Sequence, residues 1–144
     1  MANLVPDSFK TDLLKGTFNF DSSGGSSFKL ALYTAISGLT TSTTAFTTSN
    51  EVSTSGTNYT SGGNALTNNG VAVSSNIAFV DFADLTFSSV TLSAVGALIY
   101  KSSSGNEAVL VLDFGGTKTA TNADFVVQFP TANSSSAIIR LGDA

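Results

Sequence analysis

The segment that most limits the fold of this chain is residues 94–116, AVGALIYKSSSGNEAVLVLDFGG. Two apolar runs flank the polar sequence KSSSGNE, a pattern that predicts two antiparallel strands joined by a turn. Neighbouring side chains of a strand point to opposite faces, so a hairpin on the surface of a domain alternates apolar and polar residues. Both faces of this hairpin are apolar, and the chain must therefore bury both of them.

We expect one face of the hairpin to fill the core and a different part of the molecule to cover the other. The predicted core face consists of Val95, Ala97, Ile99, Val109 and Val111. The predicted second face consists of Leu98, Tyr100, Leu110, Leu112 and Phe114. The two assignments can be exchanged. Three covers for the second face are open, namely the long segment 36–63, a helix near the N-terminus, or another chain.

The rest of the chain consists mainly of short β patterns between polar turns. Asn69-Gly70 predicts a tight turn or a bulge. Segment 36–63 is rich in serine and threonine but carries recurring apolar residues, so we expect an ordered loop with a helical turn near Thr44–Thr48. The sequence therefore predicts an all-β fold, an antiparallel β-sandwich of jelly-roll-like type. Strands are predicted at residues 17–20, 28–35, 64–75, 76–82, 84–94, 121–130 and 135–142.

One short helix is predicted near the N-terminus, in PDSFKTDLLKG. Asp7 is suited to the N-cap, and Gly16 to the left-handed position that follows the last turn. Two turns of helix are unstable alone, so this helix must pack either on its own sandwich or on a neighbouring subunit. Its apolar face is expected to contain Phe9, Leu13 and Leu14.

A chain of 144 residues is long enough for one hydrophobic core. We divide it into an N-terminal arm with the short helix, residues 1–24, and a β-sandwich domain, residues 25–144.

The composition argues against most functions that need chemistry or charge. The chain has no histidine and no cysteine, so the usual general base and the commonest metal ligands are missing. Six scattered basic residues against ten acidic ones, a net charge of −4, provide no basic surface for nucleic acid. No apolar run approaches the roughly 20 residues of a membrane-spanning helix. We therefore expect no enzyme activity, no cofactor or metal, and neither nucleic acid nor a membrane as partner.

A few residues still suggest chemistry. Asp81 and Asp84 allow a paired-carboxylate hydrolase, but we favour a structural interpretation, with Asp81 at a sheet edge and Asp84 capping a loop. The glycine-rich segments 21–27 and 112–118 lack the spacing of a phosphate-binding loop, which favours turns or bulges. A structural calcium ion is a minor alternative, with the isolated acids Asp21, Asp113, Asp124 and Asp143 as its candidate ligands.

A series of segments in the second half of the chain resembles a group of small structural proteins of tailed-bacteriophage particles. These segments are GALIY at 96–100, VLVLDFGG at 109–116, FVVQFP at 125–130 and AIIR at 137–140. The resemblance covers roughly residues 25–141 and includes no catalytic motif. It implies a head decoration (cement) protein, a tail or neck component, or a fibre-associated module. We rank decoration first, because the chain is small and acidic and has no coiled-coil or repeat pattern.

A decoration protein of this kind is made in the host cytoplasm and binds the exterior of the capsid. Its expected partners are the major capsid protein or other virion proteins and further copies of itself, with a trimer favoured. The competing class is a host-receptor or carbohydrate-binding module that uses exposed Tyr59 or Tyr100. The candidate subunit-contact residues are Pro6, Phe9, Leu13, Leu14, Tyr59 and Tyr100.

Overall fold

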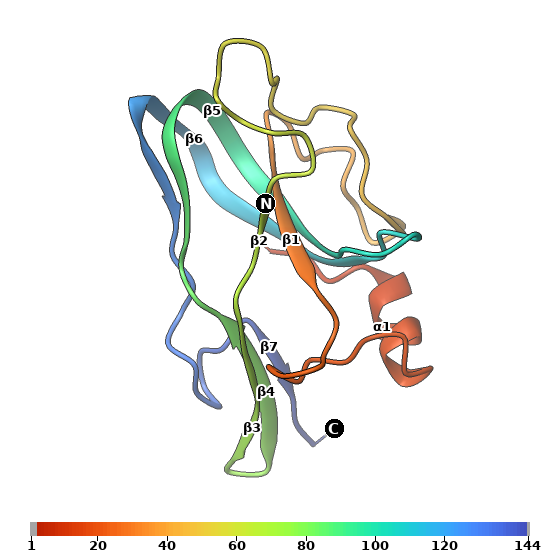
Figure 1. The fold of residues 1–144 in the computed structure, drawn as a ribbon. Helices are drawn as coiled ribbons and strands as arrows, with labels where there is room; N and C mark the ends of the chain where they lie inside the picture. Colours follow the sequence, from red (N-terminus) through yellow and green to blue (C-terminus); the bar gives the residue numbers. More distant parts are fainter. Residues whose placement is uncertain (1–2, 144) are drawn as a thin grey trace.

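The computed structural model describes residues 3–143, which form one short helix and seven strands in two antiparallel sheets (Figure 1). The predicted all-β sandwich with one short helix is thus confirmed. The helix is α1 (Asp7–Leu14). The four-stranded sheet, in the order β2-β1-β5-β6, contains β1 (Phe28–Tyr33), β2 (Asn64–Ala65), β5 (Leu85–Lys101) and β6 (Ala108–Val127). The three-stranded sheet, in the order β3-β4-β7, contains β3 (Asn68–Ser74), β4 (Ile77–Phe82) and β7 (Ile139–Leu141).

Strands β5 and β6 form a single long hairpin that bends sharply near its middle (Figure 1). Ala94 pairs with Lys118 but Gly96 pairs with Asp113, so β6 carries extra residues at the bend. Gly115, at φ 74°, lies in this bulge. The glycine-rich part of β6 is therefore a bulge within a strand, and segments that the sequence predicted as separate strands are continuous.

The main core gathers side chains from α1, β1, β4 and both halves of the bent hairpin. Phe9, Phe18, Phe20, Phe28 and Phe82 form a connected series of rings, with centroids 4.7–6.1 Å apart between neighbours. The N-terminal arm thus belongs to the same core as the sandwich. The predicted strand at 17–20 is wrong: this segment is irregular, and burial of its two phenylalanines, rather than strand pairing, produces the alternation in its sequence.

The second face of the hairpin is covered by the chain itself. Ile36, Leu39 and Phe46 of the 36–63 segment pack there, with the Phe46 ring stacked on Tyr100 at a centroid distance of 4.8 Å. Leu4 pairs with β6 in an antiparallel bridge and packs against the same cluster. We call residues 36–63 the cover segment. It has no helical turn near Thr44–Thr48, because Ala45 there pairs with Glu107 in an extended bridge.

The predicted division of hairpin residues between the two faces is partly wrong. Ile99 pairs with Leu110 and Leu98 with Val111, so Leu110 lies in the main core and Val111 on the second face. By the same register Leu112 is in the main core, with Phe114 packed against it, while Val95 packs on the second face. For the residues of β6 the reason is a bulge, since Tyr100 pairs with Ala108 and leaves Val109 as an extra residue that shifts the alternation. Val95 lies at a separate irregularity, where the pairing register shifts between Ala94 and Gly96.

The close packing of the cover segment on the hairpin requires a glycine at position 96. A Cβ there would lie 2.7 Å from Ile36 Cγ2 and closer still to the carbonyl oxygen of Leu112. We expect Gly96→Ala to lower the free energy of unfolding by about 1–3 kcal/mol, measured by urea denaturation. Gly38→Ala is the matched control, because a Cβ at Gly38 meets nothing within 4 Å. Equal stability of the two variants would contradict this account of the packing.

Candidate functional site

The six residues predicted to contact other subunits do not form one surface. Leu13 is partly buried, and Leu14 is 90% exposed. The other four, whose side chains are buried within the chain itself, are Pro6, Phe9, Tyr59 and Tyr100.

A sugar-binding surface would require exposed tyrosine rings, but Tyr59 and Tyr100 are both buried. The Tyr59 hydroxyl donates to Glu51 Oε1 at 2.8 Å and accepts the Leu32 N–H at 3.0 Å. The Tyr100 hydroxyl donates to the Gly62 carbonyl oxygen at 2.7 Å. Burial raises the pKa of both phenols. Both side chains are neutral and hold the cover segment to the sheet.

Leu13 and Leu14 line an apolar groove between α1 and β7, with a volume of about 800 Å³. Leu141 of β7 also lines it and is 57% exposed. The charged residues along the groove are Lys10 and Arg140. The remaining lining residues are Val5, Phe9, Val109, Leu110, Ile138 and Ile139.

A smaller apolar pocket of about 260 Å³ adjoins this groove and extends it across the three-stranded sheet. Both are lined by Leu13, Ile139 and Leu141. The smaller pocket also reaches Val71 of β3, which is 52% exposed. We refer to Leu13, Leu14, Val71, Ile139 and Leu141 together as the α1–β7 surface. Sequence reasoning missed its last three members, because strand alternation does not reveal which face stays uncovered.

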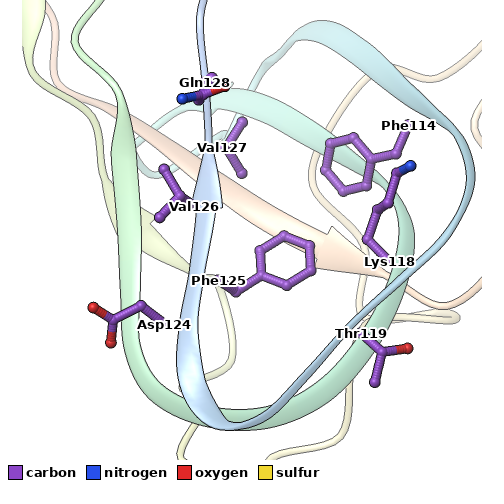
Figure 2. Close-up of a pocket in the computed structure, with 8 residues that line it drawn as sticks. All are labelled: Phe114, Lys118, Thr119, Asp124, Phe125, Val126, Val127 and Gln128. Carbon is purple, nitrogen blue, oxygen red and sulfur yellow. The ribbon is translucent and has the colours of Figure 1, made fainter.

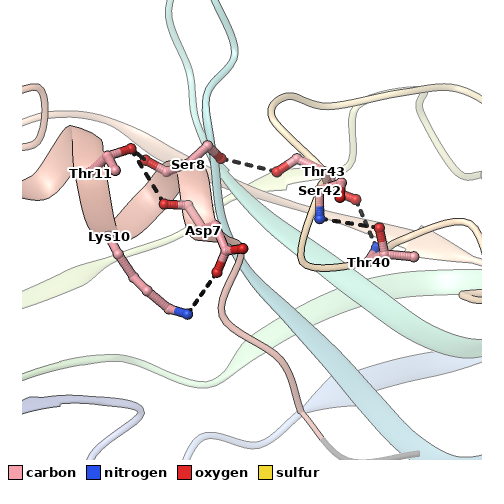
Figure 3. A network of polar contacts seen from close by, with 7 residues as sticks. All are labelled: Asp7, Ser8, Lys10, Thr11, Thr40, Ser42 and Thr43. Atoms are coloured by element: carbon pink, nitrogen blue, oxygen red, sulfur yellow. Dashed lines mark hydrogen bonds and ion pairs between the residues drawn. The ribbon is translucent and has the colours of Figure 1, made fainter.

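Polar contacts at the start of α1 fix this helix against the cover segment (Figure 3). Asp7 N–H donates to the Thr41 carbonyl oxygen at 2.9 Å, and Ser8 Oγ donates to that of Thr43 at 3.0 Å. Asp7 is not the N-cap: Pro6 holds that position, and Asp7 instead accepts a hydrogen bond from Lys10 at 2.9 Å. A tertiary contact therefore satisfies the N–H of the first helical residue, and no side chain caps the helix.

Gly16 follows α1 at φ 78°, the left-handed conformation predicted from the sequence. Leu14 is consequently held at the end of a short, anchored helix, and its side chain contributes almost nothing to the core.

Asp81 lies in β4, the central strand of its sheet, rather than at a sheet edge, and its side chain is only 1% exposed. Its Oδ1 accepts the Phe82 N–H at 2.9 Å, whereas Oδ2 has no hydrogen-bond partner. Burial raises the pKa of this carboxyl, and the nearby charge of Asp84 adds to the effect. Asp84 is exposed and accepts the Phe129 N–H at 2.8 Å, so it caps a loop.

Another hollow, of about 360 Å³, lies within the bend of the hairpin (Figure 2). Figure 2 shows the rings of Phe114 and Phe125, from the two ends of the bend in β6, side by side in it, with centroids 6.0 Å apart. Its charged residues are Lys118 and Asp124. Asp124 is engaged in accepting the Ser89 N–H at 3.0 Å. The hollow thus holds a structural hydrogen bond and no close pair of acid and base.

The described residues bring no metal-binding cluster together. Within residues 3–143, no three histidine, cysteine or acidic side chains form a group that could hold a metal ion. In the same range, no helix has both the length and the apolar character needed to cross a membrane.

Comparisons with protein-family models, with curated proteins and with solved structures found no match to this chain. The site is therefore interpreted from its own geometry. That geometry offers an exposed apolar surface beside the cationic side chains of Lys10 and Arg140.

Asp81 should make stability depend on pH in a defined direction. Because its pKa is higher in the folded state than in the unfolded chain, the folded state loses stability as the pH rises from the ordinary aspartate pKa of about 4. Asp81→Asn should therefore raise the free energy of unfolding at pH 7 by about 1–3 kcal/mol, measured by urea denaturation. The gain should shrink as the pH is lowered towards 4.

Asp84→Asn is the control, because Asp84 is exposed and its carboxylate already accepts a hydrogen bond. It should show no such gain. An Asp81→Asn protein that is less stable than the parent at pH 7 would show that the buried carboxylate is better accommodated than its contacts indicate.

Proposed function

We propose that this protein is a non-enzymatic structural protein that binds other protein subunits through the α1–β7 surface. The observation that carries the proposal is the exposure of Leu14, Leu141 and Val71 along one continuous apolar groove. Exposed apolar patches of this kind mark sites of protein interaction. The absence of histidine from the sequence and the structural roles of Asp81 and Asp84 also favour a function without catalysis.

Within this class we propose a bacteriophage head decoration protein on the capsid exterior, with the major capsid protein as its partner. The support is the resemblance carried by the segments between residues 96 and 140. Apolar contacts are well suited to this role, because salt screens them far less than ion pairs. A homo-oligomer binds a symmetric shell through several subunits at once, so its overall avidity is much higher than the affinity of a single contact.

Leu14→Asp tests the surface. Leu14 is 90% exposed, so the variant should fold with nearly unchanged stability. Loss of one buried leucine from an interface makes the free energy of binding less favourable by about 1.5–3 kcal/mol. Binding to capsids stripped of this protein should therefore weaken at least about tenfold. The measurement is co-sedimentation of the purified protein with those capsids. Val126→Asp is the matched control, because Val126 is 49% exposed but does not line the groove.

The outcomes separate the two parts of the proposal. Binding of the unaltered protein to tails and not to heads would overturn the decoration role but leave the surface standing. Equal binding by Leu14→Asp and Val126→Asp would overturn the surface. A glycan array that detects a bound saccharide would favour the receptor-binding alternative instead.

A further inference from the structure

The free edge of β3 is unusual among the sheet edges of this protein. β3 pairs with β4 on one side, and the described residues provide no strand on the other side. Its hairpin with β4 projects from the body of the molecule (Figure 1). Val71 and Val73 are 52% and 70% exposed. No charged residue occurs in the sequence between Glu51 and Asp81.

Proteins usually protect a free edge with a charged side chain, a proline or a cover, because the unpaired backbone groups can bind another strand. The other edges are either very short or carry charge. β2 and β7 have only two and three residues, β7 also carries Arg140, and the outer part of β6 carries Lys118 and Asp124. On β3 a bulge at Asn69-Gly70 disturbs only the first residues and leaves 71–74 regular.

The register of the β3–β4 hairpin identifies the backbone groups that face outwards. The turn residues Ser75 and Asn76 both have positive φ, 52° and 64°, as a two-residue type I′ turn requires. The pair that flanks this turn, Ser74 and Ile77, is hydrogen-bonded, and hydrogen-bonded pairs then alternate along the strands. Ala72 is consequently bonded to β4.

The backbone groups of the residues on either side of Ala72 point in the opposite direction to those of Ala72. The N–H and C=O groups of Val71 and Val73 point away from β4, towards the free edge. Their side chains lie on one face of the strand, since residues two apart do so. The free edge therefore offers two donors, two acceptors and two exposed valine side chains within three residues.

We propose that β3 pairs antiparallel with β3 of a second copy of this chain, around a twofold axis at Ala72. In this register Val71 lies opposite Val73 of the second copy, and Val73 lies opposite its Val71. Both pairs are hydrogen-bonded pairs, because these are the residues whose backbone groups face outwards. The two Ala72 residues meet at the axis, in the non-hydrogen-bonded position where Cα atoms approach to about 4.5 Å.

The self-complementary pattern of the edge favours a second copy over an unrelated strand. One symmetric register satisfies all four outward backbone groups of each β3 segment and places all four exposed valines on one face. The small side chain of Ala72 suits the closest approach. With no charge on the strand, two identical edges meet without repulsion. The contact produces a dimer, in contrast to the trimer that the sequence favours, and it is independent of any role in a virion.

A cysteine at the axis tests the register. The chain has no native cysteine, so Ala72→Cys introduces a single thiol. Two Ala72 positions in a non-hydrogen-bonded pair are within the range of Cα separations that a disulfide spans. We expect mild oxidation with oxidised glutathione to convert this variant to a covalent dimer. Ser74→Cys is the control, because in the same register its two copies are about 13 Å apart and cannot be bridged.

Two double variants distinguish pairing of the strands in this register from nonspecific apolar association. Val71→Lys with Val73→Lys places lysine opposite lysine in the twofold register, whereas Val71→Lys with Val73→Glu places lysine opposite glutamate. Both lose the same two valines, which are largely exposed. The dimer dissociation constant of the Lys/Lys variant, measured by sedimentation equilibrium, should exceed that of the Lys/Glu variant at least about tenfold. Circular dichroism checks that both fold.

Three results would overturn the proposal. One is a parent protein that stays monomeric at every concentration, with Ala72→Cys cross-linking no faster than Ser74→Cys. Another is self-association that the Lys/Lys variant does not weaken relative to the Lys/Glu variant. The third is a trimer in solution whose stability the two double variants leave unchanged. Preferential cross-linking through Ala72→Cys together with the charge-dependent dimer would support it.

Discussion

Burial of both faces of the β5–β6 hairpin is the requirement on which the rest of this structure depends. Burial of each face removes a row of aliphatic side chains from water, and no arrangement that covers only one face would be stable. One face belongs to the main core, and Ile36, Leu39 and Phe46 cover the other. A serine- and threonine-rich segment is thereby ordered, because its apolar residues have a sheet to pack on and its polar groups bond to Glu51 and to buried tyrosines.

The position of α1 follows from that cover. The first turn of the helix bonds to carbonyl groups of the cover segment, and Phe9 enters the main core beside Phe18. What remains outside is the far end of the helix, with Leu14, next to the short edge strand β7. The exposed apolar surface thus lies where the last elements of the fold meet, and the polar side chains around it are occupied in structural hydrogen bonds. This surface is the one through which we propose that the protein binds other subunits.

Local patterns predicted the elements well where one physical effect dominates. Alternation located β1 and β4, Asn69-Gly70 marked a bulge, and Gly16 ended the helix in the left-handed conformation. Predictions that depended on the pairing register of two strands were less accurate. A single extra residue, Val109, moved the residues after it to the opposite face. Of the predicted contact residues, only Leu14 is largely exposed, because apolar character does not say which neighbour buries a side chain.

The sequence by itself determined that this chain is an antiparallel β protein without histidine or cysteine, because strand alternation and composition are properties of the residues alone. It also determined that the hairpin needs two covers. Only the tertiary structure decided that one of those covers is the chain's own 36–63 segment, that Asp81 is buried, and that β3 has a free uncharged edge. These outcomes depend on contacts between segments far apart in sequence, where bulges and register, which a local pattern does not reveal, decide which side chains meet.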